Sequence, residues 1–113
     1  MAAASEQGGV VVNGMSNYER DGRNSNSAVV ASVFREDYGA TPMRAIEFQR
    51  SIERAAFAIG GKNYNAPVCT VGDFLSSKSG TEPTDVIPTY MGGKGCTLAN
   101  MNEIMPRFIC EAL

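Results

Sequence analysis

The sequence predicts an α+β fold: a small, mainly antiparallel sheet with one long helix packed on it and short helices near the C-terminus. Three observations favour this class: short β-branched runs between turn residues, one long helical segment with clear start and stop signals, and a helical apolar period close to the last residue. With 113 residues, 43% hydrophobic and 19% charged, the chain has the size and composition of a single domain spanning residues 1–113.

Short apolar runs predict the strands. Residues 10–12 are three valines between turn residues, and residues 28–33 are apolar at both alternating positions, which predicts a strand buried from two sides. Residues 67–71 alternate more weakly and are a third candidate. The polar connection 13–27 is longer than a hairpin loop, and connections of that length are often functional.

The clearest element is a helix over residues 42–59. Thr41 is a favoured N-cap, Pro42 suits the first helical position, and Gly60 marks the end. A second apolar group falls nearly opposite the expected core face, which indicates either a partner surface or partial exposure that needs no partner. The core face consists of Ala45, Phe48, Ile52, Ala55, Ala56 and Ile59, and the opposite group of Met43, Ile46 and Phe57.

Further helices are expected in the second half of the chain. Residues 70–73 resemble a capping box and predict a short helix with Val71, Phe74 and Leu75 turned inward. Residues 91–96 are a glycine-rich stretch expected to form a loop. In the final segment Pro106 should divide a helical period into two short pieces. Because that period runs to the last residue, we expect the chain to be a piece of a longer protein.

Composition excludes several classes of function. The chain has no histidine, and Cys69, Cys96 and Cys110 are widely spaced, which excludes a zinc site and a histidine-activated nucleophile within it. An odd number of cysteines predicts free thiols in the cytoplasm. The net charge of −2 and the short apolar runs favour neither nucleic acid nor membrane as a partner.

The connection 13–27 carries the candidate site residues. They share the ability to hold anionic or carbonyl groups through hydrogen bonds. The same residue types are also common in a solvated turn, where Arg20 beside Asp21 would form only a weak surface ion pair. The candidates are Asn13, Ser16, Arg20, Asp21, Asn24 and Asn26.

Five separated segments carry a resemblance to a known family. They are GVVVNGMSNYERDGRNSNSA (9–28), IEFQR (46–50), GKNYNAP (61–67), VGDFL (71–75) and MPRFICEAL (105–113). Together they resemble the uncharacterised bacterial FAD-dependent dehydrogenases, also labelled NAD(FAD)-utilising dehydrogenases. The resemblance implies the middle, inserted domain of such a flavoprotein. The dinucleotide-binding glycine motif would precede it, and the remaining FAD-binding sequence would follow it.

The resemblance implies a function for the domain. It would cover the flavin and shape the substrate pocket, with FAD in the parent protein but none bound to this chain alone, no metal, and no catalysis by this chain by itself. The connection 13–27 would face flavin or substrate, with Arg20 as an anchor. The remainder of the parent would contact Met43, Ile46 and Phe57. The alternative is a free-standing interaction or homodimerisation domain that uses the same three residues.

Overall fold

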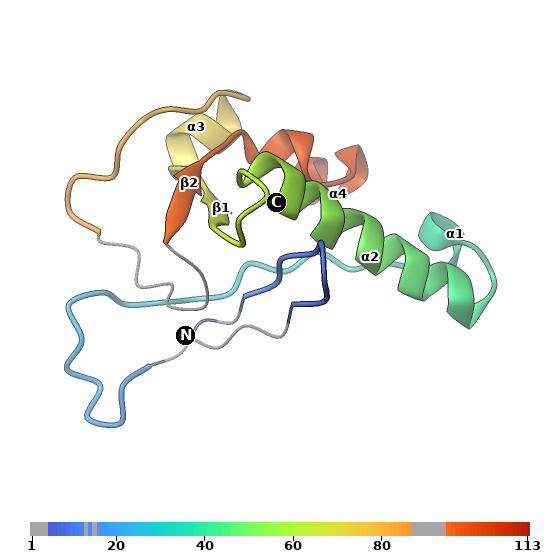
Figure 1. The fold of residues 1–113 in the computed structure, drawn as a ribbon, viewed down its shortest axis with the longest axis horizontal. Helices are drawn as coiled ribbons and strands as arrows, with labels where there is room; N and C mark the ends of the chain where they lie inside the picture. Colours follow the sequence, from blue (N-terminus) through green and yellow to red (C-terminus); the bar gives the residue numbers. More distant parts are fainter. Residues whose placement is uncertain (1–4, 13, 15, 87–94) are drawn as a thin grey trace.

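The computed structural model describes residues 5–12, 14, 16–86 and 95–113, and within them it has the expected α+β composition (Figure 1). The long helix α2 lies at the centre, and a small sheet, the short helices and an extended N-terminal segment surround it. The elements are α1 (Arg35–Tyr38), α2 (Pro42–Ile59), β1 (Ala66–Val68), α3 (Val71–Leu75), β2 (Cys96–Leu98), the 3-10 helix η1 (Met101–Glu103) and α4 (Arg107–Ala112).

The sheet is parallel, so the prediction of a mainly antiparallel sheet is wrong. β1 pairs with β2 in the register Ala66 with Cys96 and Val68 with Leu98. The physical reason is the connection: α3 and a long segment separate the two strands, and such a crossover suits a parallel pair, whereas an antiparallel pair needs only a hairpin. β1 begins one residue before the segment 67–71 in which the third strand was expected.

Helix α2 has the predicted bounds. The Thr41 Oγ1 accepts a hydrogen bond from the Arg44 N–H at 3.3 Å, and the Gly60 N–H donates to the Ala56 carbonyl at 2.9 Å. On its inner face Ala56 forms a buried cluster with Val10 and Ile104. The predicted core face is confirmed, since its residues are buried or half-buried.

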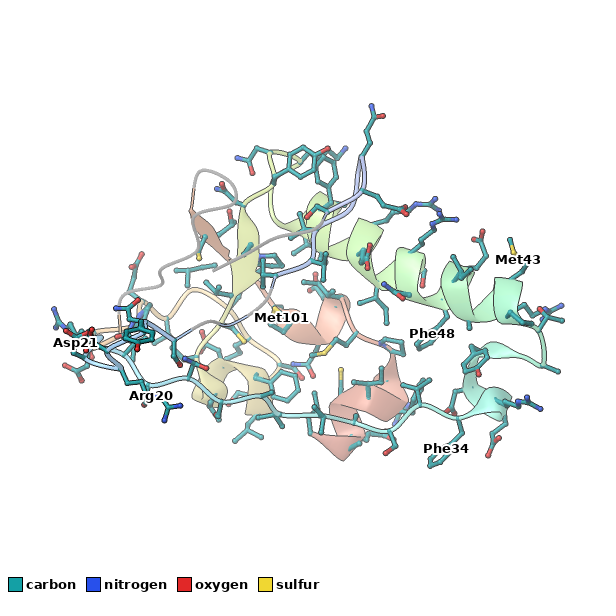
Figure 2. The ribbon with its side chains drawn as sticks, turned by 90° about the horizontal axis from the view of Figure 1, so that it is seen from below. Arg20, Asp21, Phe34, Met43, Phe48 and Met101 are labelled. Atoms are coloured by element: carbon teal, nitrogen blue, oxygen red, sulfur yellow. The ribbon has the colours of Figure 1, made fainter. Side chains whose placement is uncertain are left out.

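An aromatic row joins α1, α2 and α4. The ring of Phe48 on α2 lies 6.4 Å from Tyr38 at the end of α1 and 6.2 Å from Phe108 on α4, centroid to centroid. Phe48 lies on the side of α2 that faces α4 (Figure 2). These separations are within the range in which aromatic pairs attract each other. The row therefore packs the first half of α2 against both α1 and α4.

The two N-terminal strands predicted at residues 10–12 and 28–33 are absent from the structure. Residues 10–12 run against α2 instead, where Val10 is buried and its N–H donates to the Glu53 carbonyl at 3.0 Å. Residues 28–33 are extended along the outside of the molecule, and Val29 and Val30 are exposed rather than buried from two sides. A strand needs a neighbouring strand for its backbone groups, and the described residues place no strand beside either segment.

Helix α3 forms where it was predicted, and of its three expected inward residues only Phe74 is half-buried. Thr70 is the N-cap, and its Oγ1 accepts a hydrogen bond from the Asp73 N–H at 3.2 Å. Val71 and Leu75, expected to face inward, are exposed, while Asp73 is buried. The reason is polar anchoring: the Asp73 carboxylate accepts hydrogen bonds from the N–H and the hydroxyl of Thr81 at 2.9 and 2.8 Å.

The C-terminal segment confirms the predicted division at Pro106. The 3-10 helix η1 lies before it, and Pro106 is the N-cap of α4. Ile104 and Ile109 are buried. Of the expected glycine-rich loop at 91–96, residues 91–94 lie outside the described residues. No helix in the described part of the chain is long and apolar enough to span a bilayer.

Candidate functional site

The connection 13–27 closes on itself at its base. Asn26 Nδ2 donates a hydrogen bond to Ser16 Oγ at 3.1 Å, which joins the two ends of the loop. A Cβ atom placed on Gly14 would lie 3.6 Å from Asn26 Oδ1, so Gly14 also lies against this pair. Asn13, the first predicted site residue, lies outside the described residues. The structure thus brings Ser16 and Asn26 together at the base of the loop.

A tight turn places Arg20 and Asp21 at the tip of the loop. The Arg20 N–H donates to the Asn17 carbonyl at 3.0 Å, and Arg20 has a φ of 53°. This left-handed conformation costs a non-glycine residue on the order of 1 kcal/mol, and such residues are often found at functional sites. Arg20 and Asp21 lie at the end of the molecule opposite α1 (Figure 2). The loop therefore presents a guanidinium and a carboxylate away from the core.

The charges of the loop are not used in ion pairs within the described residues. The two ion pairs recorded there join Arg50 to Glu6 at 3.0 Å and Arg107 to Glu111 at 2.7 Å. The surface ion pair considered for Arg20 and Asp21 is therefore not formed in the structure. Arg20, an exposed guanidinium, keeps its donors available for a ligand, while Asn24 is half-buried and already makes contacts within the protein.

The structure separates the three apolar residues that were expected to share one partner surface. Met43 and Ile46 are 62% and 43% exposed. Phe57 instead packs against the buried cluster, and its ring meets that of Tyr64 at 4.9 Å in an edge arrangement. Phe57 is covered because the chain reverses direction after α2. The Lys62 N–H donates to the Phe57 carbonyl in this turn, and Tyr64 then packs against the Phe57 ring. Only Met43 and Ile46 of the predicted partner surface are therefore exposed in the structure.

The cysteines are free and half-buried. Burial raises the pKa of the Cys69 and Cys96 thiols, so both are protonated at neutral pH and are weak nucleophiles. No group of three or more cysteine, aspartate or glutamate side chains in the described residues could hold a metal ion. These thiols therefore act as small apolar groups in the packing.

A hollow of about 260 Å³ lies beside the sheet and was not predicted from the sequence. No sequence signal could have found it, because its walls come from separate parts of the chain. Cofactor pockets usually measure ~300–1,000 Å³, so the hollow is too small for FAD. Its lining residues are Val68, Glu82, Pro83, Cys96 and Leu98.

Comparison with known proteins places the whole chain in one family. Residues 1–113 match the family described as "FAD-dependent protein, C-terminal domain-like". A curated relative from Clostridium beijerinckii, named only as an uncharacterized protein, is 46% identical over 114 residues. The alignment covers 100% of this chain and 21% of the relative. The chain thus spans about a fifth of the length of the relative that it matches.

Proposed function

This chain belongs to the family of FAD-dependent protein C-terminal-like domains, and from that membership we propose that it is the substrate-side domain of a larger FAD-dependent oxidoreductase, a dehydrogenase of the cytoplasm. The observation that carries the proposal is the family match over residues 1–113. The C. beijerinckii relative supports it, because most of that protein lies outside the matched region. FAD supplies the redox chemistry, and the domain contributes binding and orientation.

The connection 13–27 is the part of this domain that we assign to the flavin or the substrate. A guanidinium can hold a carboxylate or a phosphate through two parallel hydrogen bonds, and it can also polarise a carbonyl. Arg20 is exposed, held by a turn and outside any ion pair in the described residues, so it suits an anchor of this kind. The remaining predicted site residues, Asn13, Ser16, Asp21, Asn24 and Asn26, would supply hydrogen-bonding groups around it.

An Arg20→Ala variant of the full-length protein tests this assignment. We expect its Kd for FAD, or its KM for the substrate, to rise roughly tenfold or more, as for the loss of one charge-assisted hydrogen bond. Arg35→Ala is the matched control, because Arg35 is also exposed but lies in α1 at the other end of the molecule. Flavin content, FAD titration of the apoprotein and turnover are the measurements. Unchanged FAD binding and turnover in Arg20→Ala would rule out the anchor.

The exposed apolar pair on α2 is the proposed contact with the remainder of the parent protein. Met43 and Ile46 lie near the start of the helix, and neither is covered within the described chain. Their exposure equally favours the second candidate function, a homodimer formed through the same pair. Sedimentation of the full-length protein distinguishes the two. A monomer supports the intramolecular contact, whereas a dimer that Ile46→Glu dissociates supports the second candidate.

A further inference from the structure

We propose that residues 28–33 form a β-strand that is completed by pairing with a strand elsewhere in the same, longer polypeptide. The inference goes beyond the proposed function and shares with it only the premise that the chain is one domain of a larger protein. It rests on three observations: the composition of the segment, the state of its backbone and side chains, and the length of the relative.

The composition is that of an interior strand. The segment reads Ala-Val-Val-Ala-Ser-Val, and valine is among the residues that favour strands most strongly. Apolar residues at both alternating positions are typical of strands whose two faces are both covered. It contains no glycine, proline or charged residue, the types by which proteins usually keep an exposed strand edge from pairing. A solvated surface connection would not need this sequence.

The structure leaves the same segment uncovered and without backbone partners. Val29 is 74% exposed and Val30 83% exposed. Among the described residues, no hydrogen bond is recorded for the backbone groups of residues 28–33, and pairing resumes only at Phe34, whose N–H donates to the Asp37 carboxylate at 2.7 Å. The backbone is extended, as a strand requires (Figure 1). The segment thus has the extended shape and the free backbone groups that strand pairing requires, and pairing would bury its valine side chains.

Both ends of the segment are held by the rest of the domain. The base of the preceding loop is closed by the Asn26–Ser16 hydrogen bond, and α1 begins directly after Phe34 with a capping interaction. A tethered, extended segment loses less conformational freedom on pairing than a free one. Pairing would also fix the C-terminal end of the connection 13–27 against the partner sheet. A loop that faces flavin or substrate needs a fixed position of this kind.

The partner strand is assigned to the same polypeptide. In the relative that matches over the whole of this chain, the aligned region makes up 21% of the protein, so the larger part is available to supply a sheet. A partner on the same chain is present at high effective concentration and protects the valines at any protein concentration. Main-chain hydrogen bonds would give this contact its stability.

Hydrogen exchange of the full-length protein tests the proposal. Amides of residues 29–33 should exchange on the order of 100-fold more slowly than the same sequence does in an unstructured peptide, because paired amides need local opening to exchange. This protection should be unchanged on tenfold dilution. Exchange as fast as in the peptide would overturn the proposal, and protection that disappears on dilution would overturn it in favour of pairing between two copies.

A pair of matched substitutions provides a second measurement. Val30→Asp should lower the Tm of the full-length protein by about 3 °C or more, because it puts a charge into a covered strand. Val71→Asp is the control, since Val71 is 76% exposed and lies in the first turn of α3, where a carboxylate is favourable. Equal Tm values for Val30→Asp and the unmodified protein would contradict the pairing. FAD affinity of Arg20→Ala is a separate readout, so failure of the pairing and failure of the anchor are distinguishable.

Discussion

The region around α2 and the segment before α1 differ in what buries their apolar residues. From residue 42 onward the apolar face of α2 meets buried residues of this chain, and β1 finds its partner in β2. Residues 16–34 instead lie along the outside, with exposed valines and a loop whose base is closed by the Asn26–Ser16 hydrogen bond (Figure 1). The difference indicates that one region is stabilised by the chain itself, and that the other depends on what surrounds it.

The largest effect should come from the centre of the self-supported region. Ile104 is 6% exposed and belongs to the buried cluster with Val10 and Ala56. Ile104→Ala removes buried methyl groups and leaves a cavity, so the free energy of unfolding of the chain should fall by about 2–4 kcal/mol. Ile104→Val, the conservative control, should cost roughly 1 kcal/mol. Urea denaturation measures both, and equal midpoints for the two variants would show that this cluster does not stabilise the fold.

Two glycines in the same region should respond with opposite signs. A Cβ atom on Gly60 would lie 2.5 Å from the Asn65 carbonyl oxygen, so Gly60→Ala should destabilise the fold by about 1–3 kcal/mol. Gly72 lies inside α3, where a Cβ atom would make only an ordinary contact with Thr70 Oγ1 at 4.0 Å, and Gly72→Ala should stabilise the helix by roughly 0.5–1 kcal/mol. Thermal unfolding checks the pair. Shifts of the same sign would mean that the turn after α2 is not packed as described.

The smallest effect should come from the ion pair that joins the N-terminal segment to α2. A hydrogen bond and charge from Arg50 hold the pKa of Glu6 below its ordinary 4.5, so the pair stabilises the folded state above that pH. The contribution is lost as the pH falls through the lowered pKa of the folded state. Glu6→Gln should therefore lower the Tm slightly above about pH 4.5, and its difference from the unmodified chain should vanish as the pH falls through the lowered pKa. A Tm profile of Glu6→Gln that matches the unmodified chain down to strongly acidic pH would exclude this contribution.

Local signals explain why some elements could be predicted and others could not. The bounds of α2 follow from Thr41, Pro42 and Gly60, and the division of the C-terminal segment follows from Pro106, all of which act within a turn or two of the chain. The direction of the sheet could not be predicted, because it depends on which distant segment pairs with β1. The inward face of α3 was assigned to apolar residues, whereas Asp73 holds the helix through a contact with Thr81.

The candidate site was predictable only as a loop. Length and residue types singled out the connection 13–27, but its closed base depends on Asn26 reaching Ser16 across the loop, and the turn depends on the left-handed Arg20. The hollow beside the sheet combines β1, β2 and the segment near Pro83, which have no common sequence signal. Residues 28–33 were predicted to be buried from two sides. The described residues do not bury them, which is why their burial is assigned to the rest of the protein.

A crystal structure of the full-length protein with FAD bound would show directly what covers residues 28–33. We expect their backbone groups to pair with a strand outside residues 1–113 of the same polypeptide, with N···O distances of about 2.9 Å. The valine side chains would then be covered, and the tip carrying Arg20 would lie beside the flavin or the substrate pocket. A segment that faces solvent along both edges, or that pairs only with a second copy, would contradict the proposed pairing.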